Sequence, residues 1–213
     1  MPGGVAAIRE PWRMAAVWAV LSGVDPVAVL PDIDPAVLER VLGLAARPEA
    51  VLTTSAGRLF DAVAVLLGGR RRVSYEAQAA IELEALARTA VRRHVPHYDV
   101  VAEDNNVLDP APLVVALASD RAAGVDRALL ALAFHDSFGR AAAALAATVA
   151  SDSGLDVVAL TGGVFQNALL TEVVESALTA LGLRVLTHSL IPPNDGGISV
   201  GQAAIAGWAS LTA

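Results

Sequence analysis

Apolar residues recur every three or four positions along most of the chain, and this spacing predicts a protein built largely of helices. A first helix is expected over residues 11–22, where apolar side chains fall at Trp12, Met14, Val17 and Leu21. Further helices are expected over 36–46, 57–68, 75–94, 110–123 and 125–150. A helical lobe therefore begins the chain.

The pattern changes in the last third of the sequence. Residues 156–160 form a short apolar run that is typical of a buried strand, and residues 184–188 predict a second strand. One helix is expected between these strands and another after them, and this order is found in α/β folds. We therefore predict an α/β protein with a large helical lobe at residues 1–153 and a short strand-helix-strand-helix unit at residues 154–213.

The first predicted strand leads into a pair of glycines, Gly162 and Gly163. Because glycine has no Cβ atom, the backbone N–H groups there can approach an anion closely. A helix that opens over residues 166–170 would add the favourable end of its dipole. The stretch predicts a phosphate site. The alternative is a tight turn alone, because the Lys-Ser/Thr of a P-loop and the third glycine of a dinucleotide fingerprint are absent.

The second predicted strand leads into a proline- and glycine-rich turn at residues 192–197, which holds Asp195. Since the carboxyl ends of neighbouring parallel strands meet at one edge of a sheet, Asp195 is expected beside Gly162 and Gly163. A carboxylate oxygen there suits a hard cation or a magnesium-bound phosphate. The alternative is that Asp195 only caps the last helix.

Composition narrows the class of protein. The 213 residues carry a net charge of −7, and the short basic run Arg70–Arg72 is better explained as a helix end or loop than as a nucleic-acid surface. The chain has no cysteine, which excludes disulfides and a thiol nucleophile of its own. The uncharged tail 196–213 is expected to form a buried helix from Ile198 to about Trp208 rather than a membrane span. No signal peptide is evident, so the cytoplasm is the expected compartment.

Six ordered blocks of the sequence resemble the Kae1-like domain of HypF, the carbamoyltransferases that mature nickel-iron hydrogenases. The blocks are Arg9–Ala15, Thr54–Ala64, Tyr75–Ala80, Phe134–His135 and the two glycine-rich turns described above. That domain is similar in fold to actin, sugar kinases and the tRNA threonylcarbamoyl transferases. The resemblance therefore implies an actin-like ATPase, or ribonuclease H-like, half-domain.

Within this family the glycine turn holds phosphate and a late aspartate helps to bind a metal. Carried over by motif, Gly162 and Gly163 would face phosphate and Asn167 the nucleotide. Asp195 would bind a divalent metal, which is iron, zinc or magnesium. Ala77 stands where the family pattern has glycine, and this puts a close helix contact there in doubt.

Gly57 and Asp61 match the glycine-plus-acid pair with which the family approaches the ribose from the start of a helix. Glycine allows a close approach, and an acid one helical turn later can accept hydrogen bonds from two ribose hydroxyls. The alternative is that Arg58 and Asp61 form a surface ion pair.

The family's His-x-x-x-His metal motif is absent, since the four histidines are His94, His97, His135 and His188. Pro96 favours a loop around the first two. His135 is expected to be either a buried, hydrogen-bonded residue or a catalytic one, and His188 a strand-end residue. The missing motif implies that the chain corresponds to the carboxyl-terminal half of the Kae1-like domain. The amino-terminal half would then come from another polypeptide or would have been lost by truncation.

The resemblance implies part of an ATP-dependent carbamoyltransferase. Carbamoyl phosphate and ATP would give carbamoyl-adenylate, and the carbamoyl group would pass to a cysteine of the partner protein HypE. No residue of this chain is an obvious nucleophile, which fits a thiol supplied by the acceptor. The catalytic residues stay unassigned, and the isolated chain is expected to be inactive. Two alternatives remain open, an O-carbamoyltransferase of natural-product biosynthesis and a noncatalytic nucleotide-binding half-domain.

Overall fold

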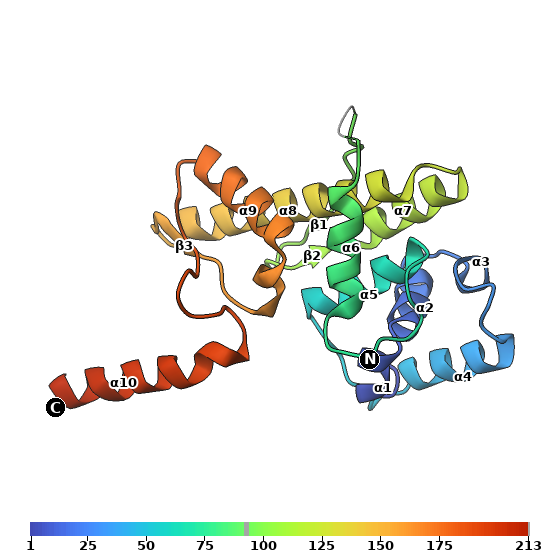
Figure 1. The fold of residues 1–213 in the computed structure, drawn as a ribbon, viewed down its shortest axis with the longest axis horizontal. Coiled ribbons are helices and arrows are strands. Elements are labelled where there is room, and N and C mark those ends of the chain that lie inside the picture. Colours follow the sequence, from blue (N-terminus) through green and yellow to red (C-terminus); the bar gives the residue numbers. More distant parts are fainter. Residues whose placement is uncertain (92–93, 213) are drawn as a thin grey trace. The chain divides into compact units, whose positions relative to one another are not determined.

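The computed structural model describes residues 1–91 and 94–212 and divides into two compact units, Met1–Ala141 and Ala142–Ala213. The elements are labelled in Figure 1. The division falls within a long helix, ahead of the boundary between residues 153 and 154 that the sequence predicts.

The first unit is mainly helical. Its helices are α1 (Val5–Arg9), α2 (Trp12–Leu21), α3 (Pro26–Val29), α4 (Pro35–Ala45), α5 (Ala56–Leu66), α6 (Gln78–Arg88), α7 (Ala111–Ala122) and the first part of α8 (Arg127–Asp152). An antiparallel hairpin of β1 (Val101–Ala102) and β2 (Leu108–Asp109) precedes α7. The predicted helices are present, although the one expected over 75–94 is shorter. Residues 92 and 93 of that prediction lie outside the described residues.

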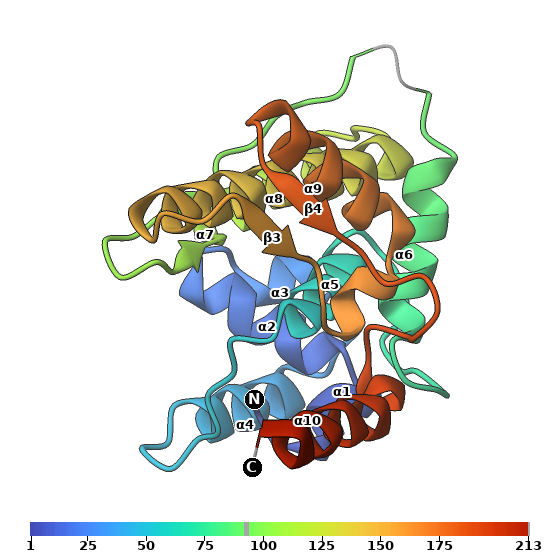
Figure 2. The ribbon, with the colours of Figure 1, turned by 90° about the vertical axis from the view of Figure 1, so that its left-hand side faces the viewer.

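Helix α5 is the central helix of the first unit, between α2 and α6 (Figure 2). Every residue from Leu59 to Leu66 is buried. Phe60 meets Phe134 of α8 edge to face, with ring centroids 4.8 Å apart. The packing therefore fixes the start of α5, where Gly57 and Asp61 lie.

Two short helices begin in the same way. Asp25 and Asp34 each accept a hydrogen bond, 2.9 Å long, from a backbone N–H two residues later, and a proline follows each of them. A side-chain cap and a proline in the first helical position both favour the start of a helix. These residues therefore set where α3 and α4 begin.

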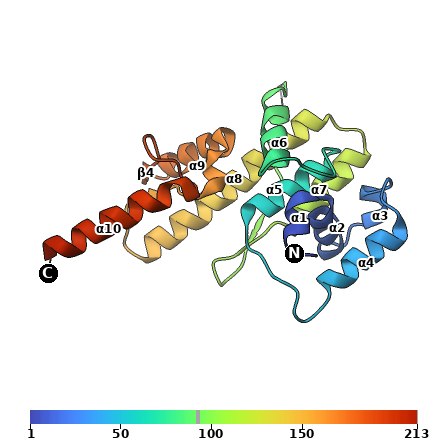
Figure 3. The ribbon, with the colours of Figure 1, turned by 60° about the horizontal axis from the view of Figure 1, so that its bottom comes forward.

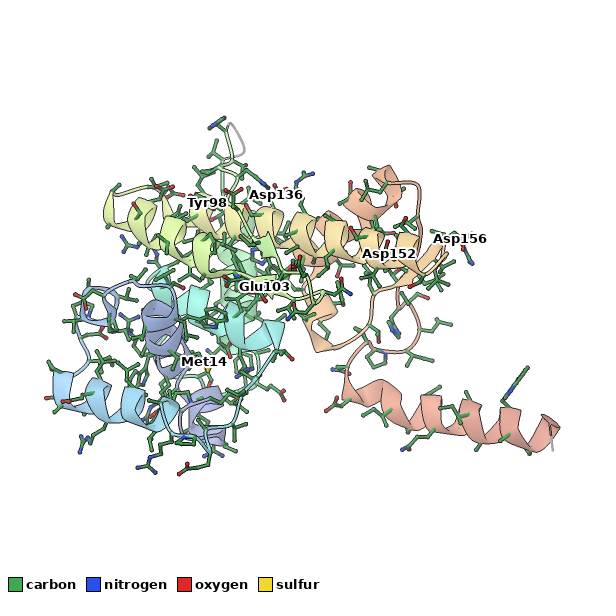
Figure 4. The ribbon with its side chains drawn as sticks, turned by 180° about the vertical axis from the view of Figure 1, so that it is seen from behind. Met14, Tyr98, Glu103, Asp136, Asp152 and Asp156 are labelled. Atoms are coloured by element: carbon green, nitrogen blue, oxygen red, sulfur yellow. The ribbon has the colours of Figure 1, made fainter. Side chains whose placement is uncertain are left out.

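The loop that leads to β1 is fastened by Tyr98, which lies beside α8 in Figure 4. Its backbone N–H donates to the hydroxyl of Ser137 (2.9 Å), and its own hydroxyl donates to Asp120 of α7 (2.6 Å). Burial, together with the Asp120 carboxylate, raises the pKa of Tyr98. The tyrosine therefore stays protonated as a hydrogen-bond donor.

Three consecutive arginines after α5 connect neighbouring elements of the first unit. Their partners are Glu82 for Arg70, Asp32 and the Val65 carbonyl for Arg71, and Glu10 for Arg72. The basic run is therefore a loop cluster with carboxylate partners, as the sequence predicts.

Ala77, directly before α6, has a left-handed backbone with φ 60° and ψ 8°. Alanine is strained in this conformation, whereas glycine is not. A glycine suits this position because of the backbone angle. The close helix contact inferred from the sequence stays a prediction.

The second unit contains two parallel strands, β3 (Val157–Ala159) and β4 (Arg184–Leu186), joined by α9 (Ala168–Ala180). Figure 2 shows the strands side by side next to this helix. Helix α10 (Ile198–Thr212) follows. The predicted order of strand, helix, strand, helix is confirmed.

Helix α9 packs through Leu170, Val174 and Leu178, which recur every four residues and are buried. The helix begins later than predicted. A 3₁₀ turn, Gly163–Gln166, separates the glycine pair from Ala168, so the amino-terminal end of α9 does not follow the glycines directly.

Helix α10 is present as predicted, but it is not buried. Figure 3 labels α10 near the carboxyl end of the chain. Its described side chains from Ile198 to Ser210 are all exposed, Ile205 at 72%. An apolar composition indicates that a helix favours burial against another surface, but it does not identify that surface. Ala213, the last residue of the predicted tail, lies outside the described residues. Within the described part of the chain, no helix is long and apolar enough to cross a membrane.

Candidate nucleotide and phosphate site

A glycine turn follows β3 and begins at Gly162, whose backbone has φ 99° and ψ 156°. Glycine is favoured here because a Cβ atom makes this conformation strained. The strand pairing reaches the turn, since the N–H of Leu160 donates to the carbonyl of Leu186 (2.9 Å). His188 lies 3.2 Å from the hydroxyl of Thr161 and so contacts the same turn, which agrees with its predicted strand-end position.

The turn after β4 contains a 3₁₀ segment, Asp195–Gly197, and its shape depends on two neighbouring residues. The side chain of Asn194 accepts a hydrogen bond from a backbone N–H two residues later (3.0 Å). A Cβ atom on Gly197 would lie 2.7 Å from the carbonyl oxygen of Pro192, so a side chain there would force the backbone apart. Asn194, and not Asp195, is the capping side chain.

These two turns lie against each other. The N–H of Gly162 donates to the carbonyl of Pro193 (2.8 Å), and a Cβ atom on Gly163 would lie 3.9 Å from the Cβ of Asn194. The expected position of the Asp195 turn beside the glycine pair is confirmed. Because Gly162 uses its N–H within the protein, an anion at this turn would be approached by Gly163 and the backbone after it.

Asp195 is exposed, and its carboxylate has no hydrogen-bond or ion-pair partner among the residues that the structure describes. A free carboxylate beside a glycine turn can act as one ligand of a cation that also bridges to phosphate. The geometry thus allows the chemistry predicted for Asp195.

Asn167 is the N-cap of α9. Its side-chain oxygen accepts a hydrogen bond from the N–H of Leu170 (2.9 Å). This contact satisfies a backbone N–H at the start of the helix, so Asn167 has a structural role. Its contact with a nucleotide stays a prediction.

In the first unit, Gly57 and Asp61 lie in the first turns of α5. Nη1 of Arg58 is 2.7 Å from Oδ2 of Asp61, and the two side chains are only 13% and 4% exposed. The ion pair considered in the sequence analysis is therefore present, but it is buried and not on the surface.

Burial raises the pKa of Asp61 to about 6, and the positive charge of Arg58 opposes that rise. Asp61 accepts no hydrogen bond from the described residues, and Nη1 of Arg58 is buried without a hydrogen-bond partner among them. The short contact between them is thus a contact of charges whose alignment is poor for a hydrogen bond. Buried, poorly satisfied charges are costly, and they are enriched at functional sites.

The predicted site residues form two sets. Gly57 and Asp61 belong to the first unit, whereas Gly162, Gly163 and the Asp195 turn belong to the second. Within the second unit, the hydrogen bond from Gly162 to Pro193 holds the glycine turn next to the Asp195 turn.

The described histidines do not assemble a metal site. His135 is fully buried, and its Nδ1 lies 2.7 Å from the Ala131 carbonyl, so this nitrogen donates. Burial lowers the pKa of His135, which keeps the ring neutral in the core. His94 and His97 lie outside helices and strands. The described residues contain no group of three or more histidine, cysteine, aspartate or glutamate side chains placed to hold a metal. A metal therefore does not fit these residues alone.

Two contributors to the site were missed in the sequence. Asn194 caps the second turn, and the Pro193 carbonyl joins the two turns. The asparagine was detectable, because asparagine directly before a short helical segment is a favoured cap. A backbone contact between two turns far apart in sequence leaves no local signal.

Comparisons with known proteins agree on one family. Residues 1–202 match the family described as carbamoyltransferase, Kae1-like domain, second subdomain. The carbamoyltransferase HypF of Rhodobacter capsulatus is 42% identical over 206 residues, which are 96% of this chain and 26% of that protein. A HypF homologue of Cupriavidus necator is 39% identical over 218 residues, with 97% of this chain and 55% of the relative covered.

Solved structures give the same result. A crystal structure of full-length HypF in its phosphate- and nucleotide-bound form superposes with a TM-score of 0.85 at 32% identity, over 97% of this chain and 27% of that one. HypF of T. kodakarensis gives a TM-score of 0.83 at 25% identity, over 95% of this chain and 28% of that one. The chain thus spans between about a quarter and about half of the length of these relatives.

Proposed function

Because the chain belongs to the HypF carbamoyltransferase family, as the second subdomain of its Kae1-like domain, we propose that it supplies the phosphate- and nucleotide-binding part of an ATP-dependent carbamoyltransferase. The chain covers only part of each relative, so the proposal assigns to it one part of the active site and not the whole reaction. In isolation it is expected to be inactive.

The observation that carries this proposal is the contact between two turns at the carboxyl ends of parallel strands. The hydrogen bond from Gly162 to Pro193 joins a glycine turn to the turn that presents the free carboxylate of Asp195. In open α/β sheets, ligands bind at this end of the strands. The solved relative that binds phosphate and a nucleotide has a closely similar fold, which supports the same ligand class here.

This arrangement also supports an actin-like fold, of which the chain would be one half. A parallel strand pair with its connecting helix, followed by a further helix, is compatible with a nucleotide-binding α/β lobe. The remaining half of the Kae1-like domain is the first partner that we propose. The exposed apolar side chains of α10, such as Ile205, and of the preceding turn, such as Leu190, are consistent with cover from such a partner.

In the proposed reaction, carbamoyl phosphate and ATP give carbamoyl-adenylate, and the carbamoyl group is then transferred to a cysteine of a HypE-type acceptor. In the second unit, Gly163 and its neighbouring backbone would approach phosphate and Asn167 the nucleotide. For the first unit, we propose that the Gly57–Asp61 turn contacts a ribose. Such fixed dipoles stabilise charge without reorganisation. The chain has no thiol, so the nucleophile comes from the acceptor. A reduced cysteine acceptor fits a cytoplasmic setting.

A divalent metal, whether iron, zinc or magnesium, would supply a positive charge next to phosphate. Asp195 is the residue that we propose as its ligand in this chain. One carboxylate is too few for a tight site, and the described residues contain no further cluster. Other ligands would therefore have to come from the partner half, and we derive no step through the metal.

Two other functions predict different results. An O-carbamoyltransferase of natural-product biosynthesis would transfer the carbamoyl group to a hydroxyl and not to a thiol. A noncatalytic half-domain would bind ATP without supporting any transfer. The identities of 42% and 39% to proteins named as HypF carbamoyltransferases support the HypF interpretation over the O-carbamoyltransferase.

The phosphate role is tested by thermal unfolding of the chain with ATP and Mg²⁺. Gly163 does not need a positive φ, and a Cβ atom there would meet only the Cβ of Asn194, at 3.9 Å. Gly163→Ala should therefore fold normally but place a methyl group where phosphate approaches. The wild-type chain should be stabilised by MgATP, and Gly163→Ala clearly less so.

The matched control is Gly201→Ala in α10, where a Cβ atom would have no atom within 4 Å. It should keep the full stabilisation by MgATP. If Gly163→Ala is stabilised as much as the control, the glycine turn does not bind phosphate. If MgATP leaves every form unchanged, both alone and with the first Kae1-like subdomain added, nucleotide binding by this chain is excluded.

A further inference from the structure

The start of α5 contains a pair of charges with an unusual arrangement. Nη1 of Arg58 and Oδ2 of Asp61 are 2.7 Å apart, one helical turn from each other, and both side chains are largely buried. Nevertheless Nη1 makes no hydrogen bond with the described residues, and none of these residues donates a hydrogen bond to Asp61. The arginine thus lends its charge to the carboxylate through Oδ2 and leaves Oδ1 without a contact from it.

Arg58 is the charged group that acts on Asp61. Helices α2, α6 and α7 and the first part of α8 pack against α5, and none of their titratable residues contributes to the shift in the pKa of Asp61. These residues are Arg13 of α2, Glu82, Glu84 and Arg88 of α6, Asp120 and Arg121 of α7, and Arg127, His135, Asp136 and Arg140 of α8. Burial disfavours the ionised carboxylate, and the Arg58 charge alone opposes that effect.

The ionisation state decides what Asp61 can bind. An ionised carboxylate only accepts hydrogen bonds, so it can receive one from each of two neighbouring hydroxyl groups. A protonated carboxyl group has an O–H donor in place of one of these acceptor positions. A ligand with a vicinal diol, such as a ribose, therefore needs the ionised form.

We propose that Arg58 is a positioning residue, which contacts Oδ2, keeps Asp61 ionised at neutral pH and leaves Oδ1 available to a ribose diol. The inference rests on the proposed ribose contact of Asp61 and adds how that contact is maintained. A bidentate ion pair would occupy both carboxylate oxygens and compete with the diol, whereas the contact with Arg58 involves Oδ2 alone.

The test compares two nucleotides, ATP and 2′,3′-dideoxy-ATP, across pH 5 to 9 by calorimetric titration of the full chain with Mg²⁺. The wild-type chain should prefer ATP at neutral pH and lose this preference as the pH falls through the pKa of Asp61, which is about 6. In Arg58→Gln the preference should disappear at a pH higher by roughly one unit or more, because an opposite charge at this range lowers a carboxyl pKa by 1–3 units. Arg58→Lys, which keeps the charge, should restore most of the wild-type profile.

A carbon-13 titration of the Asp61 carboxyl group in the same proteins gives a second, ligand-free readout. Its pKa should rise in Arg58→Gln and stay close to the wild-type value in Arg58→Lys. A purely structural arginine would change stability without moving this titration or the pH at which the ATP preference is lost.

The possible failures are distinguishable. If wild type does not distinguish the two nucleotides, or if Asp61→Asn retains the preference, the ribose contact is wrong and the inference is overturned with it. If the preference depends on Asp61 but has the same pH profile in Arg58→Gln, only the role of Arg58 is overturned. If Arg58→Gln does not fold, the wild-type profile still decides, because a preference that is constant between pH 5 and 8 contradicts the inference.

Discussion

At the scale of single residues, backbone angles and buried charges explain positions that sequence patterns do not. Ala77 is an example, because its helix is predictable from apolar spacing whereas its left-handed backbone is not. The sequence showed that a glycine was missing from the pattern, but only the structure gives the physical reason. Asn167 is a second example. The family resemblance predicts only a nucleotide contact for it, whereas the structure shows that its side chain caps α9 through the N–H of Leu170.

Replacing Ala77 with glycine should stabilise the protein. The left-handed conformation costs a residue with a Cβ atom about 1–2 kcal/mol, and the greater flexibility of glycine in the unfolded chain offsets part of this gain. We expect the free energy of unfolding to rise by about 1 kcal/mol in urea denaturation. Asn106→Gly is the control, since Asn106 has φ 61° but asparagine tolerates this region, and its gain should be smaller. A loss of stability in Ala77→Gly would contradict the strain.

Asp61 predicts a pH dependence of stability. Its pKa is about 6 in the folded protein and near 3.8 in the absence of structure, so the folded state binds the proton more tightly. The stabilising effect of this proton is complete below about pH 4 and is lost as the pH rises through 6. Relative to Asp61→Asn, the wild-type free energy of unfolding should fall by roughly 3 kcal/mol between pH 4 and 7.

The comparison with Asp61→Asn at each pH removes the effects of other carboxylates. Glu10 is one of them, because burial raises its pKa but hydrogen bonds and charge from Arg13 and Arg72 outweigh this and leave the pKa lowered. Its stabilising contribution is therefore lost as the pH falls, which is the opposite sign. Urea denaturation curves that show a constant difference between wild type and Asp61→Asn would contradict the raised pKa of Asp61.

At the scale of elements, the apolar spacing located the helices well, and the two short strands were recognisable from their apolar runs and following turns. The burial of α10 was predicted wrongly, since its composition is apolar but Ile205 and its neighbours are exposed. The spacing of apolar residues indicates which side chains favour burial. Whether another surface covers them depends on the rest of the molecule. The contact between the Gly162 and Pro193 turns was predictable in outline from the parallel strands, but its hydrogen bond was not.

The arginines in the loop after α5 should contribute unequally to the free energy of unfolding. Arg71 is 25% exposed, bonds to Asp32 and also donates to the Val65 carbonyl at the end of α5 (3.1 Å). Arg72 is 78% exposed and reaches only Glu10 among the described residues. We expect Arg71→Met to lower the free energy of unfolding by about 1–2 kcal/mol and Arg72→Met by less than about 0.5 kcal/mol. Equal losses in chemical denaturation would show that the carbonyl contact is unimportant.

Helix α10 should open more readily than α5. Its described side chains are exposed up to Ser210, whereas α5 is buried from Leu59 to Leu66. Helices with few buried apolar contacts open at a low free energy. Amide hydrogens of α10 should therefore exchange with deuterium well before those of α5 in the isolated chain, and addition of the first Kae1-like subdomain should slow them. Equal protection of the two helices in the isolated chain would contradict this assignment.

At the scale of the whole molecule, the resemblance in six sequence blocks identified the family, and the match of residues 1–202 confirms it. The sequence could not show how the ligand contacts are divided, since Asp61 and Asp195 belong to separate units and the described residues lack a metal cluster. The chain covers 26% of one relative and 55% of another, so it corresponds to one part of these larger proteins.

The central claim is that the Asp195 turn belongs to a carbamoyl-transfer site. The most direct measurement is the transfer of radiolabelled carbamoyl groups, from carbamoyl phosphate with ATP, to the cysteine of a HypE-type acceptor, with this chain combined with the remaining HypF modules. We predict transfer with the wild-type chain and a rate on the order of 100-fold lower with Asp195→Asn, because the loss of a charged ligand next to phosphate would remove about 3 kcal/mol of stabilisation. Transfer by Asp195→Asn at the wild-type rate would contradict the account.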